Sequence, residues 1–321
     1  MSDSRQPNVI LVITDDQGYP DLGCTGNPWI QTPHIDAFAA ASVRCNDFHV
    51  QPLCTPTRGA IMSGHRPATN GAWATCWGRS LMNADETTLA DLFGAAGYRT
   101  GLFGKWHLGD NYPYRPQDRG FQHVVAHKGG GVGQTPDFWG NNYFDDTYFH
   151  NGDPVPHVGY CTDVWFDQAM DWIGRVADAP FFCTLATNAP HDPYLVADSY
   201  RDRYADNPDI CQPAFYGMIT NIDENFARLR AKLDELNIED DTILIFMTDN
   251  GSSGSAELDD NQFETRGYNA GLRGKKASFY DGGHKVPFFV RWPGGGLADR
   301  DVSEMCLDVD LMPTFADLCG L

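Results

Sequence analysis

The sequence predicts an α/β protein whose mostly parallel central sheet is covered by helices on both faces. Continuous apolar, β-branched runs, such as NVILVIT at residues 8–14, are typical of strands buried on both faces. Amphipathic patterns, with apolar residues three or four positions apart, lie between these runs. Strands and helices that alternate in this way form parallel sheets, because each connecting helix packs against a sheet face.

The individual elements follow from the same patterns. Strands are predicted over residues 8–14, 98–103, 181–186, 242–248 and 286–292. Helices are predicted over residues 86–96, 163–177, 215–236 and 308–318. The helix at 86–96 places Leu89, Leu92 and Phe93 on one face, and Gly97 is its C-cap. The helix at 215–236 is the clearest, since its apolar residues keep the helical spacing throughout.

Residues 128–156 are the exception, because they are rich in Gly, Asp, Asn and aromatic residues and show no periodicity. A long irregular stretch inside a compact domain usually shapes a pocket or is mobile. Its aromatic side chains could stack on a sugar or aryl group, or pack within the loop. These side chains are Phe138, Trp139, Tyr143, Phe144 and Tyr148. The chain shows no repeat and no linker-like composition, so we expect one domain over residues 1–321.

Composition and charge restrict the function. The 321 residues are 42% hydrophobic and 21% charged, which excludes a disordered chain. Lys and Arg total 23 and Asp and Glu total 43, so the formal charge is −20. Such a chain repels nucleic acids and anionic membranes, and neither is expected as a partner. An anionic substrate would need a local positive site.

The sequence shows no targeting signal and no paired cysteines, and we therefore expect a cytoplasmic protein. No stretch approaches the roughly 18 consecutive apolar residues of a membrane-spanning helix. The start of the chain lacks the basic leader and apolar core of a signal peptide. The nine cysteines include no CxxC pair, which favours reduced thiols.

Two acidic turns follow directly on two predicted strands. Asp15 and Asp16 come after the first strand, and Asp249 and Asn250 follow the strand at 242–248. Ligands of open α/β sheets collect beyond the carboxyl ends of the strands, so both turns can face one crevice. Their oxygen ligands suit Ca²⁺ or Mg²⁺, although Asp, Asn and Gly are also ordinary turn residues. Asp15 and Asp16 can converge only if the chain turns there, and Gly18 permits a turn.

The segment around Cys54 is the most informative. Pro56 suits the first turn of a helix, which places Cys54 at or just before the helix N-terminus. Free backbone N–H groups there favour an anion or a nucleophile, and Arg58 adds a positive charge one turn later. From the residues alone, Cys54 is either an activated thiolate or a small buried cysteine.

The Cys-x-Pro-x-Arg pattern resembles the signature of the type I, formylglycine-dependent sulfatases, an arylsulfatase-like family of the alkaline phosphatase-like superfamily. Further motifs occur in the order of that family and extend over nearly the whole chain. These motifs are Asp15-Asp16, GKWHLG at 104–109, APH at 189–191, TDNG at 248–251, and LRGKK at 272–276 before YDGG at 280–283.

The resemblance implies that the cysteine is oxidised to formylglycine by a formylglycine-generating or sulfatase-maturating enzyme. It also implies a divalent cation, usually Ca²⁺, with Mg²⁺ or Mn²⁺ as alternatives. The implied metal ligands are Asp15, Asp16, Cys54, Asp249 and Asn250.

The remaining motif residues are implied to act on sulfate. Arg58 would hold the hydrate of the aldehyde, and Lys105 and His191 would bind sulfate oxygens. His107 would be the base that breaks the sulfated intermediate, and Lys276 would assist the leaving oxygen. Taken singly, each of these lysines and histidines could also be an ordinary surface or partly buried side chain.

The charge of this set fits an anionic substrate. Three carboxylates and a divalent cation leave about −1, and the three basic groups then bring the cluster to about +2. The expected reaction is hydrolysis of a small-molecule or carbohydrate sulfate ester. Two alternatives remain: a phosphonate or phosphate diester hydrolase of the same superfamily, and an inactive anion-binding fragment. Members of the family usually continue into a C-terminal antiparallel subdomain, which we expect to be absent from this chain because it stops at Leu321.

Overall fold

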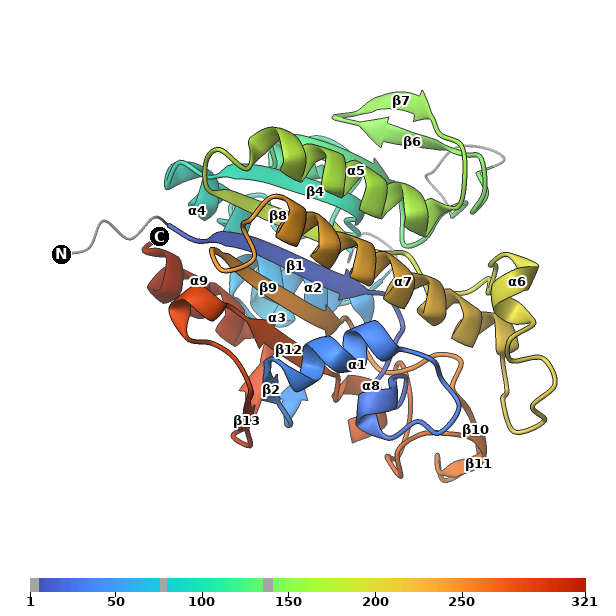
Figure 1. The fold of residues 1–321 in the computed structure, drawn as a ribbon. Coiled ribbons are helices and arrows are strands. Elements are labelled where there is room, and N and C mark those ends of the chain that lie inside the picture. Colours follow the sequence, from blue (N-terminus) through green and yellow to red (C-terminus); the bar gives the residue numbers. More distant parts are fainter. Residues whose placement is uncertain (1–5, 76–79, 135–140) are drawn as a thin grey trace.

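A computed structural model describes residues 6–75, 80–134 and 141–321 of the chain (Figure 1). Its elements, with η for 3₁₀ helices, are β1 (Asn8–Thr14), η1 (Gly23–Thr25), α1 (Pro33–Ala40), β2 (Val43–Cys45), β3 (Phe48–His49), α2 (Cys54–Ser63), α3 (Pro67–Asn70), α4 (Leu89–Ala95), β4 (Arg99–Lys105), η2 (Pro116–Asp118), β5 (His123–His127), β6 (Thr147–His150), β7 (Asp153–Pro156), α5 (Cys161–Val176), β8 (Phe181–Ala186), α6 (Asp198–Arg201), α7 (Pro213–Glu235), β9 (Thr242–Thr248), β10 (Ala256–Leu258), β11 (Glu264–Gly267), α8 (Asp281–His284), β12 (Phe288–Arg291), η3 (Pro293–Gly295), β13 (Arg300–Val302), β14 (Cys306–Leu307), η4 (Asp308–Asp310) and α9 (Leu311–Cys319).

The central sheet confirms the predicted fold class. Its strand order is β13-β2-β12-β9-β1-β8-β4-β5-β6-β7. The middle of the sheet, β9-β1-β8-β4-β5, is parallel. Antiparallel pairing begins where β12 joins β9 on one side and β6 joins β5 on the other. All the continuous apolar runs predicted as strands lie in this sheet.

Helices cover both faces of the sheet, as Figure 1 shows. Ile10 and Val12 of β1 pack in one core cluster with residues of α1, α5 and α7. Val9 and Leu11, the alternate residues of the same strand, pack in a second cluster with residues of α2, α4 and α9. Because neighbouring residues of a strand point to opposite faces, a strand between two helical layers must be apolar throughout.

Several predicted boundaries shift by two to three residues. The helix predicted from residue 86 begins at Leu89, because Thr88 and Asp91 form a capping box at its start. The strand predicted to end at residue 103 continues to Lys105, which places this lysine at the carboxyl end of β4. The helix predicted from residue 308 begins with a 3₁₀ turn, η4, before α9.

The expectation of an irregular stretch at residues 128–156 is partly wrong. Its last third forms the hairpin β6–β7, which adds two antiparallel strands to the edge of the central sheet. Tyr143 and Tyr148 are buried in the core and are not available for stacking on a ligand. Phe144 is more exposed and packs on Tyr160, with 5.0 Å between the ring centroids. Phe138 and Trp139 lie outside the described residues.

Among the described helices, none is long and apolar enough to span a bilayer. Every described cysteine is a free thiol, which agrees with the expectation of reduced cysteines.

One buried carboxylate joins two helices of the same layer. Asp223 of α7 accepts hydrogen bonds from the backbone N–H groups of His34 and Ile35, in the first turn of α1 (3.1 and 2.7 Å). The side chain is only 1% exposed. We expect Asp223→Ala to lower the free energy of unfolding by about 1–3 kcal/mol in urea denaturation, because the buried N–H of Ile35 and the partly buried N–H of His34 lose their acceptor.

Asp223→Asn keeps an acceptor and should lose less stability. Burial raises the pKa of Asp223 to about 6. Burial therefore disfavours the ionised carboxylate, and the wild type loses stability as the pH rises from the ordinary pKa of an aspartate through about 6. The amide of the Asp223→Asn variant does not titrate, so the stability of the variant should not change in this way. Relative to the wild type, Asp223→Asn should become more stable on going from about pH 5 to about pH 8. An unchanged difference would contradict this assignment.

Candidate active site

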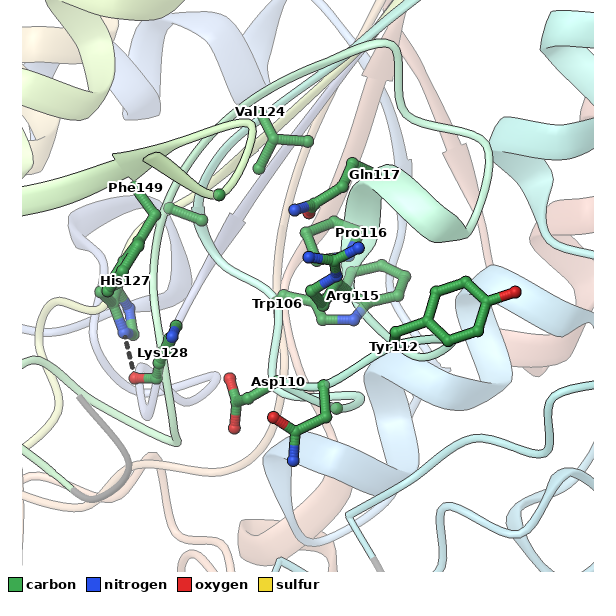
Figure 2. A pocket seen from close by; sticks show the side chains of 14 residues that line it. Trp106, Asp110, Tyr112, Arg115, Pro116, Gln117, Val124, His127, Lys128 and Phe149 are labelled. Atoms are coloured by element: carbon green, nitrogen blue, oxygen red, sulfur yellow. Dashed lines mark hydrogen bonds between the residues drawn. The ribbon is translucent and has the colours of Figure 1, made fainter. Parts of the chain in front are cut away.

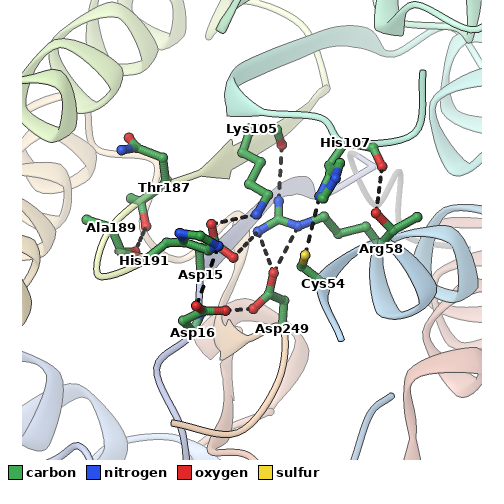
Figure 3. A network of polar contacts seen from close by, with 12 residues as sticks. Asp15, Asp16, Cys54, Arg58, Lys105, His107, Thr187, Ala189, His191 and Asp249 are labelled. Carbon is green, nitrogen blue, oxygen red and sulfur yellow. Dashed lines mark hydrogen bonds and ion pairs between the residues drawn. The ribbon is translucent and has the colours of Figure 1, made fainter. Parts of the chain in front are cut away.

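The carboxyl ends of four neighbouring strands carry a cluster of buried polar side chains (Figure 3). Asp15 follows β1, Lys105 ends β4, His191 follows β8, and Asp249 follows β9. The helix α2 enters the same place from one face of the sheet, and the loop between β11 and α8 supplies Lys276. Parallel strands end at a common edge, so residues far apart in the sequence meet there.

The two adjacent aspartates converge because the chain turns at Asp16. This residue has φ 66°, in the left-handed region. The chain thus turns at the aspartates themselves, two residues before Gly18, and Gly18 is not in that region. Gly18 is instead needed for close packing, because a Cβ there would lie 2.3 Å from the backbone nitrogen of Ser252. The loop after β1 thus packs tightly on the loop after β9.

Each of the three carboxylates of the cluster is paired with a basic side chain. Asp15 Oδ2 lies 2.6 Å from Lys105 Nζ. Asp249 Oδ2 accepts two hydrogen bonds from the Arg58 guanidinium, at 2.8 and 3.0 Å. The third pair joins Asp16 Oδ2 to Lys276 Nζ at 2.6 Å. Without an added cation, these six groups carry no net charge when all are ionised.

The neighbouring lysine, Lys275, does not reach the cluster. Its Nζ lies 3.4 Å from the backbone oxygen of Ala256, away from the carboxylates. Despite the opposing effect of burial, Asp16 raises the pKa of Lys276, which remains charged. The structure thus brings Lys276, and not Lys275, to the predicted site.

Cys54 is the first residue of α2, as the position of Pro56 predicts. Its Sγ lies 3.3 Å from Nδ1 of His107. One donor atom of Cys54 also lies within 4.8 Å of donor atoms of Asp15 and Asp249. Burial raises the pKa of the thiol to about 11, so the unmodified side chain is protonated at neutral pH. Of the two alternatives, the structure shows a buried, protonated cysteine and not an activated thiolate, and it places this cysteine within the polar cluster.

His107 is held in a strained conformation next to this sulfur. Its φ is 59°, and its backbone oxygen accepts a hydrogen bond from Thr55 Oγ1 at 3.2 Å. Burial, with the charges of Lys105 and Arg58, holds the pKa of the imidazole well below its ordinary value. A neutral imidazole has a nitrogen lone pair that can accept a proton.

Sequence reasoning did not identify the backbone that packs on His107. A Cβ at Gly130 would lie 2.7 Å from Cε1 of the imidazole, so only glycine leaves room for the ring. The signal was present in the run Gly129-Gly130-Gly131, within the stretch predicted to shape a pocket.

His191 completes the cluster on the side of Asp16. Its Nε2 lies 3.7 Å from Asp16 Oδ2, and its Nδ1 lies 2.6 Å from the backbone oxygen of Asp192. Tyr143 donates a hydrogen bond to the backbone oxygen of His191 at 3.2 Å. A buried tyrosine of the segment at 128–156 thus holds the backbone of His191 in place.

Two buried oxygen atoms of the cluster fit a bound cation. Oδ1 of Asp15 and Oδ1 of Asn250 are buried and have no hydrogen-bond partner among the described residues. The amide Nδ2 of Asn250 donates to Asp16 Oδ1 at 3.0 Å, which fixes the amide with its oxygen free. Carboxylate and amide oxygens are the donors that Ca²⁺ and Mg²⁺ prefer. The residues present therefore fit a hard divalent cation.

The electrostatics of the carboxylates agree with that interpretation. Burial raises the pKa of Asp15 to about 7, in spite of the nearby Lys105. Burial acts in the same direction on Asp249, but Arg58 and Lys105 hold its pKa below the usual range. The basic side chains thus compensate the charge of Asp249 well and that of Asp15 poorly. Asp15 Oδ1, the atom without a hydrogen bond among the described residues, lies 3.9 Å from the nearest Arg58 nitrogen.

A cavity of about 210 Å³ lies beside the stretch that follows β4 (Figure 2). Trp106, between Lys105 and His107 in the sequence, lines it, but none of the predicted site residues does. Lys128 Nζ lies 4.2 Å from the centroid of the Phe149 ring in its wall. The cavity therefore does not contain the polar cluster.

Known proteins resemble this chain in sequence. A sequence model of the sulfatase family matches residues 7–321. Human arylsulfatase A is 28% identical over 347 residues, which cover 99% of this chain and 65% of the relative. N-acetylgalactosamine-6-sulfatase of Canis lupus familiaris is 29% identical over 349 residues, covering 99% and 63%. The chain therefore spans less than two thirds of the length of these relatives.

The structural comparison gives the same result. The crystal structure of Ps i-CgsB superposes with a TM-score of 0.87 at 29% identity, covering 98% of this chain and 72% of that one. A structure of Ps i-CgsB in complex with k-i-k-neocarrahexaose superposes with a TM-score of 0.85.

The parallel sheet, with its acidic turns and the helix that begins at Cys54, defines a protein of the alkaline phosphatase-like superfamily. Within this class, the chain belongs to the sulfatase family, whose model covers it from residue 7 to its last residue.

The buried pairing of Arg58 predicts a large effect on stability. Its side chain is 5% exposed and that of Asp249 is fully buried. We expect Arg58→Met to lower the free energy of unfolding by about 3–5 kcal/mol, measured with chelator present, because it leaves the buried carboxylate of Asp249 without its paired cation.

Arg201→Met is the matched control. This arginine is 47% exposed and pairs with Asp198 and Asp202 on the surface, where solvent screens the pairs, so its loss should leave stability nearly unchanged. Equal effects of the two substitutions would show that the buried pair does not hold the cluster together.

Proposed function

We propose that this chain hydrolyses an organic sulfate ester to an alcohol and sulfate, with residue 54 as the nucleophile and a bound divalent cation. The pairing of the three carboxylates with Lys105, Arg58 and Lys276 carries the proposal. Those six groups are neutral together, so one divalent cation makes the cluster about +2. This charge lets a protein of net charge −20 bind a sulfate group.

The cation is proposed to be Ca²⁺, with Mg²⁺ or Mn²⁺ as alternatives. Asp15, Asp16, Asp249 and Asn250 would hold it together with the modified side chain of residue 54. Once bound, the cation supplies positive charge that polarises the reacting sulfate oxygens. The buried Oδ1 atoms of Asp15 and Asn250, which have no hydrogen-bond partner among the described residues, support this assignment.

The nucleophile is proposed to be formylglycine, formed from Cys54 by a formylglycine-generating or sulfatase-maturating enzyme. The hydrated aldehyde supplies two hydroxyl groups: one attacks sulfur, and the other later expels sulfate and restores the aldehyde. A thiol lacks the second oxygen. The thiol pKa of about 11 also leaves unmodified Cys54 a poor nucleophile at neutral pH.

The basic residues would bind and orient the sulfate. Lys105, Lys276 and His191 are proposed to contact its oxygens, and Arg58 to hold the hydrate. Their charges would stabilise the negative charge that develops as the sulfur–oxygen bond of the ester breaks. Lys276 or His191 would protonate the departing alcohol.

His107 would act as the base in the second half of the reaction. Its Nδ1 lies 3.3 Å from the side-chain sulfur of residue 54, within reach of a hydroxyl in that place. Because its pKa is held well below the ordinary value, the imidazole is neutral and can accept the proton of the second hydroxyl.

Carbohydrate sulfates are the substrate class that the relatives favour, with small aryl sulfates as the second class. One relative is named for a sulfated amino sugar, and Ps i-CgsB has been crystallised with an oligosaccharide. We propose a carbohydrate sulfate ester as the substrate, held with its sulfate in the cluster.

Turnover of an aryl sulfate tests the reaction. We expect the matured protein to hydrolyse 4-nitrophenyl sulfate faster than bis(4-nitrophenyl) phosphate. Cys54→Ala should lower kcat/KM at least about a thousandfold, because it removes the nucleophile. Cys183→Ala, at a buried cysteine of β8 outside the site, should leave kcat/KM nearly unchanged.

Mass spectrometry of the peptide that contains residue 54 completes this test. Active protein should carry formylglycine, with the corresponding loss of mass relative to cysteine. Activity in protein that carries only the thiol would refute the proposed nucleophile, and faster phosphodiester hydrolysis would indicate the related hydrolase class instead.

Binding of the cation can be tested without activity. We expect Ca²⁺ at a hundredfold excess over its Kd to stabilise the chelator-treated protein by about 2.7 kcal/mol, measured by thermal unfolding. Asp15→Asn should abolish most of this gain because it removes a ligand charge. Asp223→Asn changes a buried carboxylate between α7 and α1, outside the cluster, and should keep the stabilisation by Ca²⁺. A gain that persists in Asp15→Asn would place the cation elsewhere.

A further inference from the structure

A second cluster of metal-binding side chains lies on two other elements. His49 ends β3, and Asp281 and His284 are the first and last residues of α8. One donor atom from each of these three residues lies within 4.8 Å of the other two. The cluster shares no residue with the site around Asp15, and it opens into a cavity of about 560 Å³ lined also by Gln51, Phe279 and Met305.

The two histidines face each other through the same ring atom. Nδ1 of His49 lies 2.9 Å from Nδ1 of His284. Two neutral lone pairs at this distance repel, so either a proton or a cation must lie between the rings. Two imidazoles bound to one tetrahedral Zn²⁺ have their nitrogens roughly 3.3 Å apart, which needs only a small separation of these rings.

The orientation of His49 is set by a carboxylate behind it. Its Nε2 lies 3.0 Å from Asp47 Oδ1, which also lies 3.1 Å from Lys285 Nζ. A carboxylate that accepts the Nε2–H of a histidine fixes the tautomer and leaves Nδ1 free to bind a metal. The His49 side chain is only 12% exposed, so packing holds it in this position.

The donor set differs from that of the first cluster. Two imidazole nitrogens and one carboxylate are typical ligands of Zn²⁺ and related transition metals, whereas the first cluster offers mainly oxygen. Asp281 is 64% exposed, so its carboxylate is free to rotate towards the histidines. The group formed by the two neutral histidines, Asp47, Asp281 and Lys285 has a net charge of −1. This negative charge favours binding of a dication.

We propose that His49, Asp281 and His284 bind a transition-metal dication of the Zn²⁺ class, with the fourth position open to the cavity. Such an ion would tie β3 to α8. The backbone N–H of Val50 already donates to the carbonyl of His284 at 2.9 Å. Because β3 ends five residues before Cys54, and α8 begins five residues after Lys276, the ion would fix both segments that enter the active site.

Zinc titration with calcium present tests the proposal. The protein is freed of metal, saturated with Ca²⁺ to fill the first cluster, and titrated with Zn²⁺ in a calorimeter. Bound zinc is counted after gel filtration. We expect the wild type to bind one Zn²⁺ more than His49→Gln or His284→Gln. Asp47→Asn should keep the stoichiometry and weaken binding about 10- to 100-fold.

His65→Gln is the matched control, because this histidine is 58% exposed and pairs with Glu86 outside the cluster. It should bind zinc as the wild type does. Equal zinc stoichiometry and affinity in the wild type and in both histidine variants would overturn the proposal, since the zinc would then be bound elsewhere.

Two further measurements keep the test valid if the histidine variants fail to fold. Asp281→Asn changes an exposed side chain and should weaken zinc binding at least about tenfold. Co²⁺ in the calcium-saturated wild type should give the visible absorption of a four-coordinate site with nitrogen and oxygen ligands. Absence of this band, together with unchanged zinc affinity in Asp281→Asn, would also overturn the proposal.

Discussion

The candidate active site of this fold depends on the balance of buried charge. Three carboxylates lie at the ends of β1 and β9, at places that exclude water, and each would be costly there alone. Lys105, Arg58 and Lys276 each come from a different segment and neutralise one of them. A cluster that is neutral by itself can accept a dication and become positive, which is the state that an anionic substrate needs.

Close backbone approach makes this convergence possible. A Cβ at Gly251 would lie 1.9 Å from the carbonyl oxygen of Gly282, so the loop after β9 touches the start of α8 without side chains between them. Gly251 also donates its N–H to the carbonyl of Gly283 at 2.8 Å. These glycines bring the segment with Lys276 close enough for its side chain to reach Asp16.

The same contact links the two clusters of metal-binding residues. α8 carries Asp281 and His284, and the segment before Cys54 carries His49. Oxygen donors dominate the buried cluster at the strand ends, and imidazoles dominate the more open one. The proposed hard cation and the proposed transition metal would therefore bind at separate places in one region of the fold, because the two ions prefer different donor atoms.

The sequence by itself determined the alternation of strands and helices, because burial on both faces requires the uninterrupted apolar runs of β1, β8 and β9. Through its motifs, it also indicated which residues assemble around Cys54. It did not reveal the short edge strands β6 and β7, which lack an apolar run because they are only partly buried.

Only the tertiary structure decided how those residues meet. The turn at Asp16, the packing of Gly130 on His107 and the contact of Lys276 with Asp16 depend on segments far apart in the chain. The facing pair of His49 and His284 is also invisible in the sequence, because 235 positions separate the two rings. Local patterns record which face of an element is buried, whereas contacts between distant loops arise only when the sheet has brought the strand ends together.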